Sequence, residues 1–208
     1  MPIVAVTQRV DVASPQLGPG ERRDGLDQAW FHFLAAADCL PVPLPNHLPL
    51  ARSMLEDLPI DGLLLTGGDN LAVYGGQTPE RDEVEFALLA LARKWTLPVL
   101  GVCRGMQVIQ HAFGAPLYPI EGHVTDSQTV VIAGAPARVN SFHRWGGLHP
   151  PTGFEAWAWA ADGVIKGVRH PAEPIVGLMW HPERMDAFRQ EDLALFRSHF
   201  NGSDGDEG

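Results

Sequence analysis

One cysteine between two glycines offers the clearest chemistry in the chain. Cys103 follows the apolar run 97–100 and lies between Gly101 and Gly105. Glycines on both sides let the backbone turn sharply where a buried strand becomes a helix, and the sulfur then points outward. At a helix N-terminus, backbone N–H groups and the helix dipole favour the thiolate. We therefore interpret Cys103 as a nucleophile, and Cys39 as the commoner kind of cysteine, a small buried hydrophobic side chain.

A histidine near the C-terminus can act as the base that such a thiol needs. His181 ends the apolar segment 175–180, and Glu183 follows it with Pro182 between them. This spacing lets the carboxylate accept the imidazole N–H and fix its tautomer, so that cysteine, histidine and glutamate form a triad. The alternatives are a histidine satisfied by the backbone and a metal site. Because the chain lacks the H-E-x-x-H and paired C-x-x-C patterns of zinc sites, we expect no metal and no cofactor.

A second glycine turn can supply hydrogen-bond donors. The strand pattern at 62–65 is followed shortly by the pair Gly67 and Gly68. Consecutive glycines leave backbone N–H groups unshielded, as an oxyanion hole for a tetrahedral acyl intermediate requires. Such a pattern by itself most often marks an ordinary turn, so its functional meaning depends on Cys103 and His181.

Four motifs resemble, in their order, the class I glutamine amidotransferase-like superfamily and its stand-alone γ-glutamyl hydrolase branch. They are the glycine turn 65–69, the nucleophile turn 101–107, the segment 139–143 and the terminal segment 177–183. The resemblance implies a three-layer α/β/α fold with a mostly parallel, flavodoxin-like central sheet and a small antiparallel extension. It also implies a cysteine hydrolase that cleaves a γ-glutamyl amide C–N bond through a γ-glutamyl thioester and releases glutamate.

The resemblance assigns roles to individual residues. Cys103 is the expected nucleophile, His181 the general base and then acid, and Glu183 the residue that orients the imidazole. Gly68 and Arg104 are the expected oxyanion N–H donors. The substrate-binding residues that it implies are Gly67, Gln107, Ser141, Phe142, His143, Arg144 and Trp145.

The residues after the third motif indicate a resemblance to one group within this hydrolase branch. Many γ-glutamyl hydrolases continue Asn-Ser-x-His with His-Gln, whereas this chain continues with Arg144 and Trp145. Together with the segments 7–9 and 23–30, this form looks most like the γ-glutamyl-CDP-amidate hydrolases, which make cytidine diphosphoramidate for phosphoramidate modification of surface polysaccharides. Two alternatives stay open: a glutaminase subunit that delivers ammonia to a partner synthetase, and a non-catalytic binding protein of the same fold.

A diphosphate substrate would need local positive charge in an acidic protein. Arg9, Arg22, Arg23 and Arg144 fall in loops that can converge near the strand ends. The chain has 15 basic and 25 acidic residues and a net charge of −10, so such a site must be a local cluster. We expect a small γ-glutamyl amide as the substrate, with a cytidine nucleotide as one leaving group, and neither nucleic acid nor membrane as a partner.

Strand and helix patterns alternate along the chain. Strands are predicted at 3–7, 40–43, 62–65, 97–101 and 175–180, and antiparallel strands at 128–133, 137–140, 154–161 and 164–170. Helices are predicted at 24–37, 48–58, 79–93, 192–200 and directly after Cys103. In such a sheet, ligands bind at the carboxyl ends of the strands, which is where Cys103, His181 and the turn 66–70 are expected to meet.

Length and composition favour one enzyme domain. With 208 residues, 45% of them hydrophobic, the chain can bury a full core. We predict a single catalytic domain over residues 1–200 and a disordered acidic tail over 201–208. The start of the chain lacks a signal-peptide pattern, and the two cysteines do not suggest a disulfide framework. These features predict a cytoplasmic enzyme, either a monomer or a homodimer.

Overall fold

The computed structural model describes residues 1–12 and 21–201, which are built around one nine-stranded sheet. Its strand order is β4 (Leu40–Leu44), β1 (Ile3–Thr7), β5 (Gly62–Leu65), β6 (Val99–Val102), β13 (Ile175–Leu178), β12 (Ile165–Arg169), β11 (Glu155–Ala160), β8 (Val124–Ile132) and β9 (Ala135–Phe142). The strands from β4 to β13 are parallel, and those from β12 to β9 pair antiparallel. The predicted parallel sheet with an antiparallel extension is confirmed, and the extension supplies four of the nine strands.

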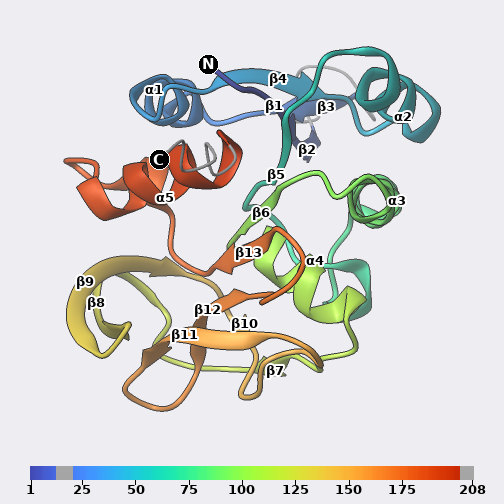
Figure 1. The fold of residues 1–208 in the computed structure, drawn as a ribbon. Coiled ribbons are helices and arrows are strands. Elements are labelled where there is room, and N and C mark those ends of the chain that lie inside the picture. The colour runs from blue at the N-terminus through green and yellow to red at the C-terminus, as the bar shows by residue number, and fades with distance from the viewer. Residues whose placement is uncertain (13–20, 202–208) are drawn as a thin grey trace.

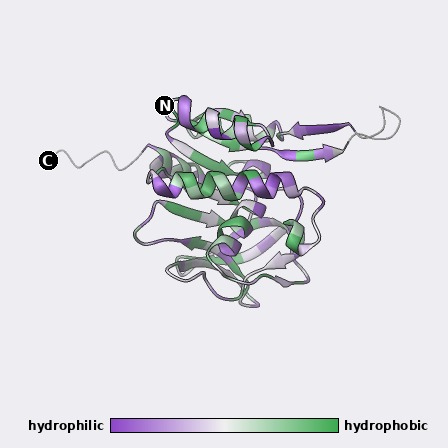
Figure 2. Cartoon of the chain, turned by 90° about the vertical axis from the view of Figure 1, so that its right-hand side faces the viewer, coloured by the Kyte–Doolittle hydropathy of each residue, from purple (hydrophilic) through white to green (hydrophobic). Residues whose placement is uncertain are grey.

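Helices cover both faces of the parallel half. Helices α1 (Ala29–Ala36) and α5 (Gln190–Phe200) lie on one face, and α2 (Leu48–Asp57), α3 (Pro79–Lys94) and α4 (Arg104–Ala112) lie on the other (Figure 1). The alternation of side chains along β5 explains this arrangement. Leu64 packs in one core cluster with Phe33 and Phe196, whereas Leu63 packs in the other with Leu88. The helices carry both hydrophobic and hydrophilic residues (Figure 2), and α3 buries the charged Arg81 and Glu85 beside its apolar residues.

The residues at its two ends account for where α3 begins and ends. The helix begins with Pro79 in its first turn, carries Glu80 and Asp82 there, and ends with Arg93 and Lys94. Proline fits the first turn because its missing N–H would have no partner there, and the charges complement the helix dipole at both ends. The helix predicted at 79–93 is confirmed to within one residue.

The helix predicted at 24–37 is wrong in its first part. Residues Arg22–Gly25 form strand β3, which pairs antiparallel with β2 (Arg9–Val12), and the helix begins only at Ala29. Asp24 ties this segment to the loop before α2, because its carboxylate accepts hydrogen bonds from Asn46 N at 2.9 Å and Nδ2 at 2.7 Å. The resulting β2–β3 hairpin extends away from the body of the molecule (Figure 2).

Short elements complete the region around the strand ends. Strand β10 (Trp145–Gly146) pairs with β7 (Tyr118–Pro119), and two 3-10 helices, η2 (Ala72–Tyr74) and η3 (Pro182–Arg184), follow β5 and β13. Within residues 1–12 and 21–201, no helix combines the length and apolar character needed to cross a bilayer. Apart from Asn201, the predicted acidic tail lies outside the described residues.

Candidate active site

Cys103 occupies the sharp turn between β6 and α4. Its φ of 52° and ψ of −103° lie outside the regions that residues with a side chain ordinarily adopt. Two close approaches hold the turn: a Cβ on Gly101 would lie 2.6 Å from the Gly105 carbonyl oxygen, and a Cβ on Gly105 would overlap the Leu65 carbonyl oxygen. Helix α4 therefore starts directly at the cysteine, and the Arg104 backbone N–H helps to lower the pKa of the thiol.

The next parallel strand brings His181 to the same edge of the sheet. Leu178 of β13 pairs with Val102 of β6, and His181 follows three residues later. The Cys103 thiol and the His181 imidazole lie close enough for each to shift the pKa of the other. His181 Nδ1 lies 2.7 Å from Glu183 Oε1, which leaves Nε2 to face the sulfur. Sulfur, imidazole and carboxylate are thus brought together, in this order, at one edge of the sheet.

Asn140, in the third motif, fixes the backbone of the histidine. Its Oδ1 accepts a hydrogen bond from His181 N at 2.7 Å, and its Nδ2 donates to His181 O at 2.8 Å. Because Asn140 lies on β9, the two bonds attach the His181 backbone to the antiparallel half of the sheet. No role for Asn140 was inferred from the sequence, because this pairing joins residues 41 positions apart.

The electrostatics favour a charged pair. Burial opposes ionisation of the Cys103 thiol, but the neighbouring imidazolium and its hydrogen bond outweigh burial, so the pKa of Cys103 lies below its ordinary value. Burial likewise opposes the charged form of His181, but the thiolate and Glu183 raise its pKa. Both shifts favour the thiolate–imidazolium pair over the neutral pair. By contrast, burial raises the pKa of the Cys39 thiol to about 11, which makes that thiol unreactive.

The glycine turn after β5 lies against the imidazole. A Cβ on Gly67 would overlap His181 Cε1, so only glycine allows the two segments to approach this closely. Gly68 has a φ of 143°, which also favours glycine, and it borders the same cavity as Cys103. The turn is therefore beside the sulfur, where an oxyanion donor would be needed.

A buried ionic network binds the backbone of this turn. Arg81 Nη2 donates to the carbonyl oxygens of Thr66 at 2.9 Å and Gly67 at 3.1 Å. Arg81 Nε donates to Glu85 at 2.9 Å, and both side chains are fully buried. Neither residue was singled out from the sequence, because an Arg/Glu pair four positions apart on a helix usually lies on a solvated face.

The Arg104 side chain belongs to the same network and points away from the sulfur. It pairs with Glu85 and Asp82 on α3. Although burial would raise the pKa of Glu85, the charges of Arg104 and Arg81 lower it, so the carboxylate stays ionised. Only the backbone of Arg104 therefore faces the reacting sulfur.

Two cavities meet at the site. The first, here named the Cys103 cavity, has a volume of about 300 Å³ and is lined by Gly68, Asp69, Asn70, Cys103, Gln107, Val124, Phe142, His143 and Arg144. The second, named the His181 cavity, has about 310 Å³ and is lined by Arg9, Val10, Asp11, Gly68, Asp69, Phe142, His181 and Arg184. They share Gly68, Asp69 and Phe142, so the sulfur and the imidazole open into adjoining spaces.

Several residues expected to bind substrate have their polar atoms already engaged. Gln107 borders the Cys103 cavity, and its Nε2 donates to Trp145 O at 3.0 Å. His143 Nδ1 also contacts Trp145 O, at 2.9 Å, which makes Nδ1 the protonated nitrogen. The Trp145 ring packs on Tyr74 at 4.8 Å between centroids and lines neither cavity. Ser141 is fully buried, and its Oγ donates to a backbone carbonyl at 2.8 Å.

A buried lysine stands behind these residues. Lys166 of β12 is 1% exposed, and its Nζ lies 2.6 Å from His143 Nε2 and 2.9 Å from Ser141 Oγ. Burial lowers the pKa of Lys166 to about 7, and burial together with the lysine charge lowers the pKa of His143 to about 3. His143 is therefore neutral at physiological pH. A lysine in a strand normally reaches solvent, so the sequence pattern contains no sign of this contact.

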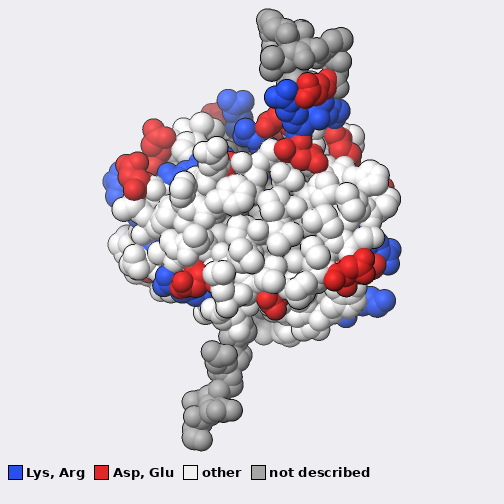
Figure 3. Space-filling view, turned by 90° about the horizontal axis from the view of Figure 1, so that it is seen from above, with Lys and Arg blue, Asp and Glu red and all other residues white. Residues whose placement is uncertain are grey.

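Two of the four expected phosphate-binding arginines lie apart from the cavities. Arg22 and Arg23 lie on the β2–β3 hairpin, where they pair with Glu80 and Glu21. The space-filling view shows arginine and acidic side chains gathered together at this end of the molecule (Figure 3). Their charges are therefore largely balanced, and neither arginine lines the Cys103 or the His181 cavity.

The other arginines border the site from different sides. Arg144 lines the Cys103 cavity, and Arg9 lines the His181 cavity. Arg184, which was not singled out from the sequence, also lines the His181 cavity because η3 turns it toward the hairpin. The only sequence feature that could have indicated Arg184 is its position directly after Glu183.

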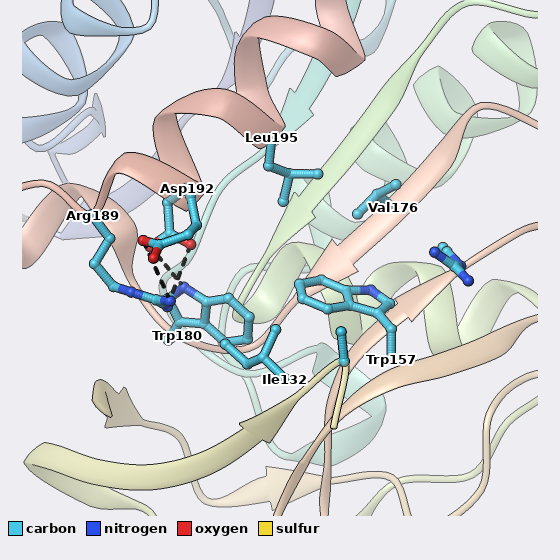
Figure 4. A pocket seen from close by; sticks show the side chains of 10 residues that line it. Ile132, Trp157, Val176, Trp180, Arg189, Asp192 and Leu195 are labelled. Carbon is cyan, nitrogen blue, oxygen red and sulfur yellow. Dashed lines mark hydrogen bonds and ion pairs between the residues drawn. The ribbon is translucent and has the colours of Figure 1, made fainter. Parts of the chain in front are cut away.

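A further hollow of about 260 Å³ lies between α5 and the sheet (Figure 4). Trp157 packs edge-on against Trp180 at 5.5 Å there, and Trp180 Nε1 donates to Asp192 at 3.2 Å. No residue expected at the site from the sequence lines this hollow. Among residues 1–12 and 21–201, no group of three or more histidine, cysteine or acidic side chains is arranged to hold a metal ion.

Comparison with known proteins shows the family and the fold. The family model described as Peptidase C26 matches residues 2–129 and 122–183. The γ-glutamyl-CDP-amidate hydrolase of Campylobacter jejuni is 31% identical over 144 residues, which are 68% of this chain and 71% of that protein. The glutamine-hydrolyzing GMP synthase subunit of Methanosarcina barkeri is 30% identical over 159 residues, 72% of this chain and 77% of that protein. A glutamine amidotransferase structure from Thermotoga maritima has a TM-score of 0.64 at 19% identity, covers 88% of this chain and 76% of its own, and shows the shared fold.

Proposed function

The chain belongs to the peptidase C26 family of class I glutamine amidotransferase-like hydrolases, and from this premise we propose that it hydrolyses γ-glutamyl amides through Cys103, His181 and Glu183. The observation that carries the proposal is the order of thiol, imidazole and carboxylate where the two cavities meet: Cys103 and His181 each shift the pKa of the other, and His181 Nδ1 is bonded to Glu183. A nucleophile, a base and an orienting acid in this order are the parts that acyl transfer requires.

In the first half of the reaction, the Cys103 thiolate attacks the γ-carbonyl carbon and a carbon–sulfur bond forms. The carbonyl oxygen becomes an oxyanion, for which we propose the backbone N–H groups of Gly68 and Arg104 as donors. The carbon–nitrogen bond then breaks, and the imidazolium of His181 gives its proton to the leaving nitrogen. The products are a γ-glutamyl thioester and a free amine or amidate.

In the second half, His181 takes a proton from water, which attacks the thioester carbonyl. The carbon–sulfur bond breaks, the sulfur regains its negative charge beside the imidazolium, and glutamate leaves. Glu183 keeps the imidazole in one orientation and stabilises its charge in both halves. The thiol must stay reduced throughout, so we assign the reaction to the cytoplasm.

For the leaving group we propose cytidine diphosphoramidate, which makes the natural substrate γ-glutamyl-CDP-amidate and the biological setting the phosphoramidate modification of surface polysaccharides. The support is the similarity to the Campylobacter jejuni enzyme. Arginines that border both cavities add chemical support, because a diphosphate needs guanidinium partners.

The test measures glutamate release from γ-glutamyl-CDP-amidate and from L-glutamine by the purified chain without any partner. We expect kcat/KM to be at least about 10²-fold higher for the nucleotide amide, and a glutamyl thioester on Cys103 to be detected by mass spectrometry of the quenched reaction. Cys103→Ala should abolish turnover. Cys39→Ala is the matched control and should retain it, because that thiol is buried in the core away from both cavities.

A second candidate function is a glutaminase subunit that passes ammonia to a synthetase. The observation that favours it is the similarity to the GMP synthase subunit of Methanosarcina barkeri. In that case the chain alone would hydrolyse glutamine slowly and the nucleotide amide not at all. Glutamine turnover that rises strongly only when a partner synthetase is added would replace the first proposal with this one.

A further inference from the structure

Proton transfer from His181 determines the orientation in which the substrate must bind. This inference rests on the proposed function. His181 must protonate the nitrogen that leaves, so the leaving group has to lie on the imidazole side of the sulfur. The acyl group stays on the sulfur, next to the proposed oxyanion donors of Gly68 and Arg104.

The two cavities match these two halves of the substrate. The Cys103 cavity is bordered by the sulfur, by Gln107 and by the buried, neutral His143, so we place the glutamyl group there. The His181 cavity contains the imidazole and opens between η3 and the β2–β3 hairpin. The Phe142 ring, which borders both cavities and lies 5.8 Å from the His181 ring, stands at their junction.

The charges in the His181 cavity are not equally available to a ligand. Arg9 donates through Nε to Asp11, at 3.1 Å to the nearer oxygen. Asp69 accepts backbone N–H groups of Asn70 at 2.8 Å and Gln77 at 3.2 Å, so its oxygens are engaged by their own loop. The two acids in the cavity therefore already have partners.

Arg184 is paired at longer distances than Arg9. Its ion pairs among the described residues, with Asp27 at 3.4 Å and Glu183 at 3.5 Å, both run through Nε. These distances are longer than normal charged hydrogen bonds, and the side chain is 35% exposed. No ion pair within residues 1–12 and 21–201 engages the terminal nitrogens, which can form the forked, two-bond contact that guanidinium makes with phosphate.

We propose that the His181 cavity is the leaving-group subsite and that Arg184, assisted by Arg9, selects leaving groups that carry phosphate. Arg144 lies on the other side of the sulfur and faces the glutamyl group. The hairpin arginines Arg22 and Arg23 take no part. Arg184 therefore determines specificity and does not perform the chemistry.

The experiment compares two substrates in three variants. The substrates are γ-glutamyl-CDP-amidate and the uncharged-leaving-group amide γ-glutamyl-p-nitroanilide, and the variants are Arg184→Met, Arg184→Lys and the control Arg52→Met. Arg52 is an exposed arginine on α2 that bonds to Glu56 at 2.8 Å, away from both cavities. We expect Arg184→Met to lower the ratio of kcat/KM values, nucleotide amide over anilide, at least about tenfold and mainly through KM. Arg184→Lys should restore part of the ratio, and Arg52→Met should leave it unchanged.

A binding measurement separates this inference from the proposed function. CDP alone should bind the wild-type protein in calorimetry and bind at least about tenfold more weakly to Arg184→Met. If the wild-type chain hydrolyses neither amide, the proposed function fails, and CDP binding still decides the role of Arg184. Equal losses on both substrates, or CDP affinity unaffected by Arg184→Met, would overturn the inference. So would a preference for a γ-glutamyl amide of a diamine, because a cation would then face Asp11 and Asp69.

Discussion

The reactivity of Cys103 depends on neighbours that lack side chains as much as on its partners. Gly67 places its backbone against the His181 ring, and a methyl group there would overlap Cε1. We therefore expect Gly67→Ala to displace the imidazole and to lower kcat/KM about 10²-fold, because a misplacement of about 1 Å is enough for such a loss. The thermal midpoint should change little.

The control for this change is Gly75→Ala, on the same loop. Gly75 has a positive φ, of 88°, and nothing lies within 4 Å of its position for a side chain. The alanine should cost about 1 kcal/mol of stability and leave turnover intact. Equal activity of the two variants would show that the imidazole does not depend on Gly67.

Glu183 is expected to act through the protonation of His181. The carboxylate and the thiolate both raise the pKa of His181, so the alkaline limb of the kcat/KM profile should lie well above the ordinary histidine value. In Glu183→Gln the limb should move to lower pH, and kcat should fall about 10²-fold or more. Glu191→Gln, at an exposed position, is the control and should reproduce the wild-type profile. An unshifted limb in Glu183→Gln would remove this role.

A buried carboxylate, that of Glu85, forms an ion pair that links helices α3 and α4 next to the site. Glu85 pairs with both Arg81 and Arg104, and its removal would leave two buried guanidinium groups without their shared partner. We expect Glu85→Gln to lower the free energy of unfolding by roughly 3–5 kcal/mol. Turnover should fall as well, because Arg81 holds the turn at 66–67.

Urea denaturation of a matched variant separates charge from hydrogen bonding. Thr7 Oγ1 donates to Glu85 at 2.7 Å and accepts from Thr66 N at 3.1 Å, so Thr7→Val removes two hydrogen bonds and no charge. Its cost should be about 2 kcal/mol. If Glu85→Gln costs no more than Thr7→Val, the network does not stabilise the fold through its charges.

The elements that carry the nucleophile were predictable because their signals are local. The apolar run before Cys103, the glycines around it and the acidic start of α3 each act within a few residues. The first part of the predicted helix 24–37 failed because Asp24 bonds to Asn46, which no local pattern reveals. The contacts of Arg81 with the turn at 66–67, of Asn140 with His181 and of Lys166 with His143 were hidden for the same reason, since each joins segments that only the folded sheet brings together.

The complete sheet places the site at the boundary between its two halves. Strand β13 pairs with β6, which leads to Cys103, and with β12, which carries Lys166. The parallel half thus supplies the nucleophile and the turn at 66–68, while the antiparallel half supplies Asn140, His143 and the lysine behind them. The site can form only when both halves are folded. The free energy of unfolding of the chain should therefore depend on buried groups in either half.

Lys166 makes the stability of the chain dependent on pH. Burial lowers the pKa of Lys166 from 10.5 to about 7 in the folded protein. Between these values the unfolded chain binds more protons than the folded one, so the free energy of unfolding rises as pH rises. Below about pH 7 both states are charged, and the full cost of the buried charge is present. His143 adds loss in acid, because its folded pKa of about 3 lies below its ordinary 6.5.

Lys166→Met removes the alkaline part of this dependence, and Lys94→Met, at the exposed end of α3, is the matched control. We expect the wild-type free energy of unfolding, minus that of Lys166→Met, to grow by roughly 1–4 kcal/mol between pH 7 and pH 10, because only the wild type gains from losing the buried charge. The same difference for Lys94→Met should stay flat. Urea denaturation at several pH values in this range measures both, and a flat difference for Lys166→Met would mean that the amine reaches solvent in the folded chain.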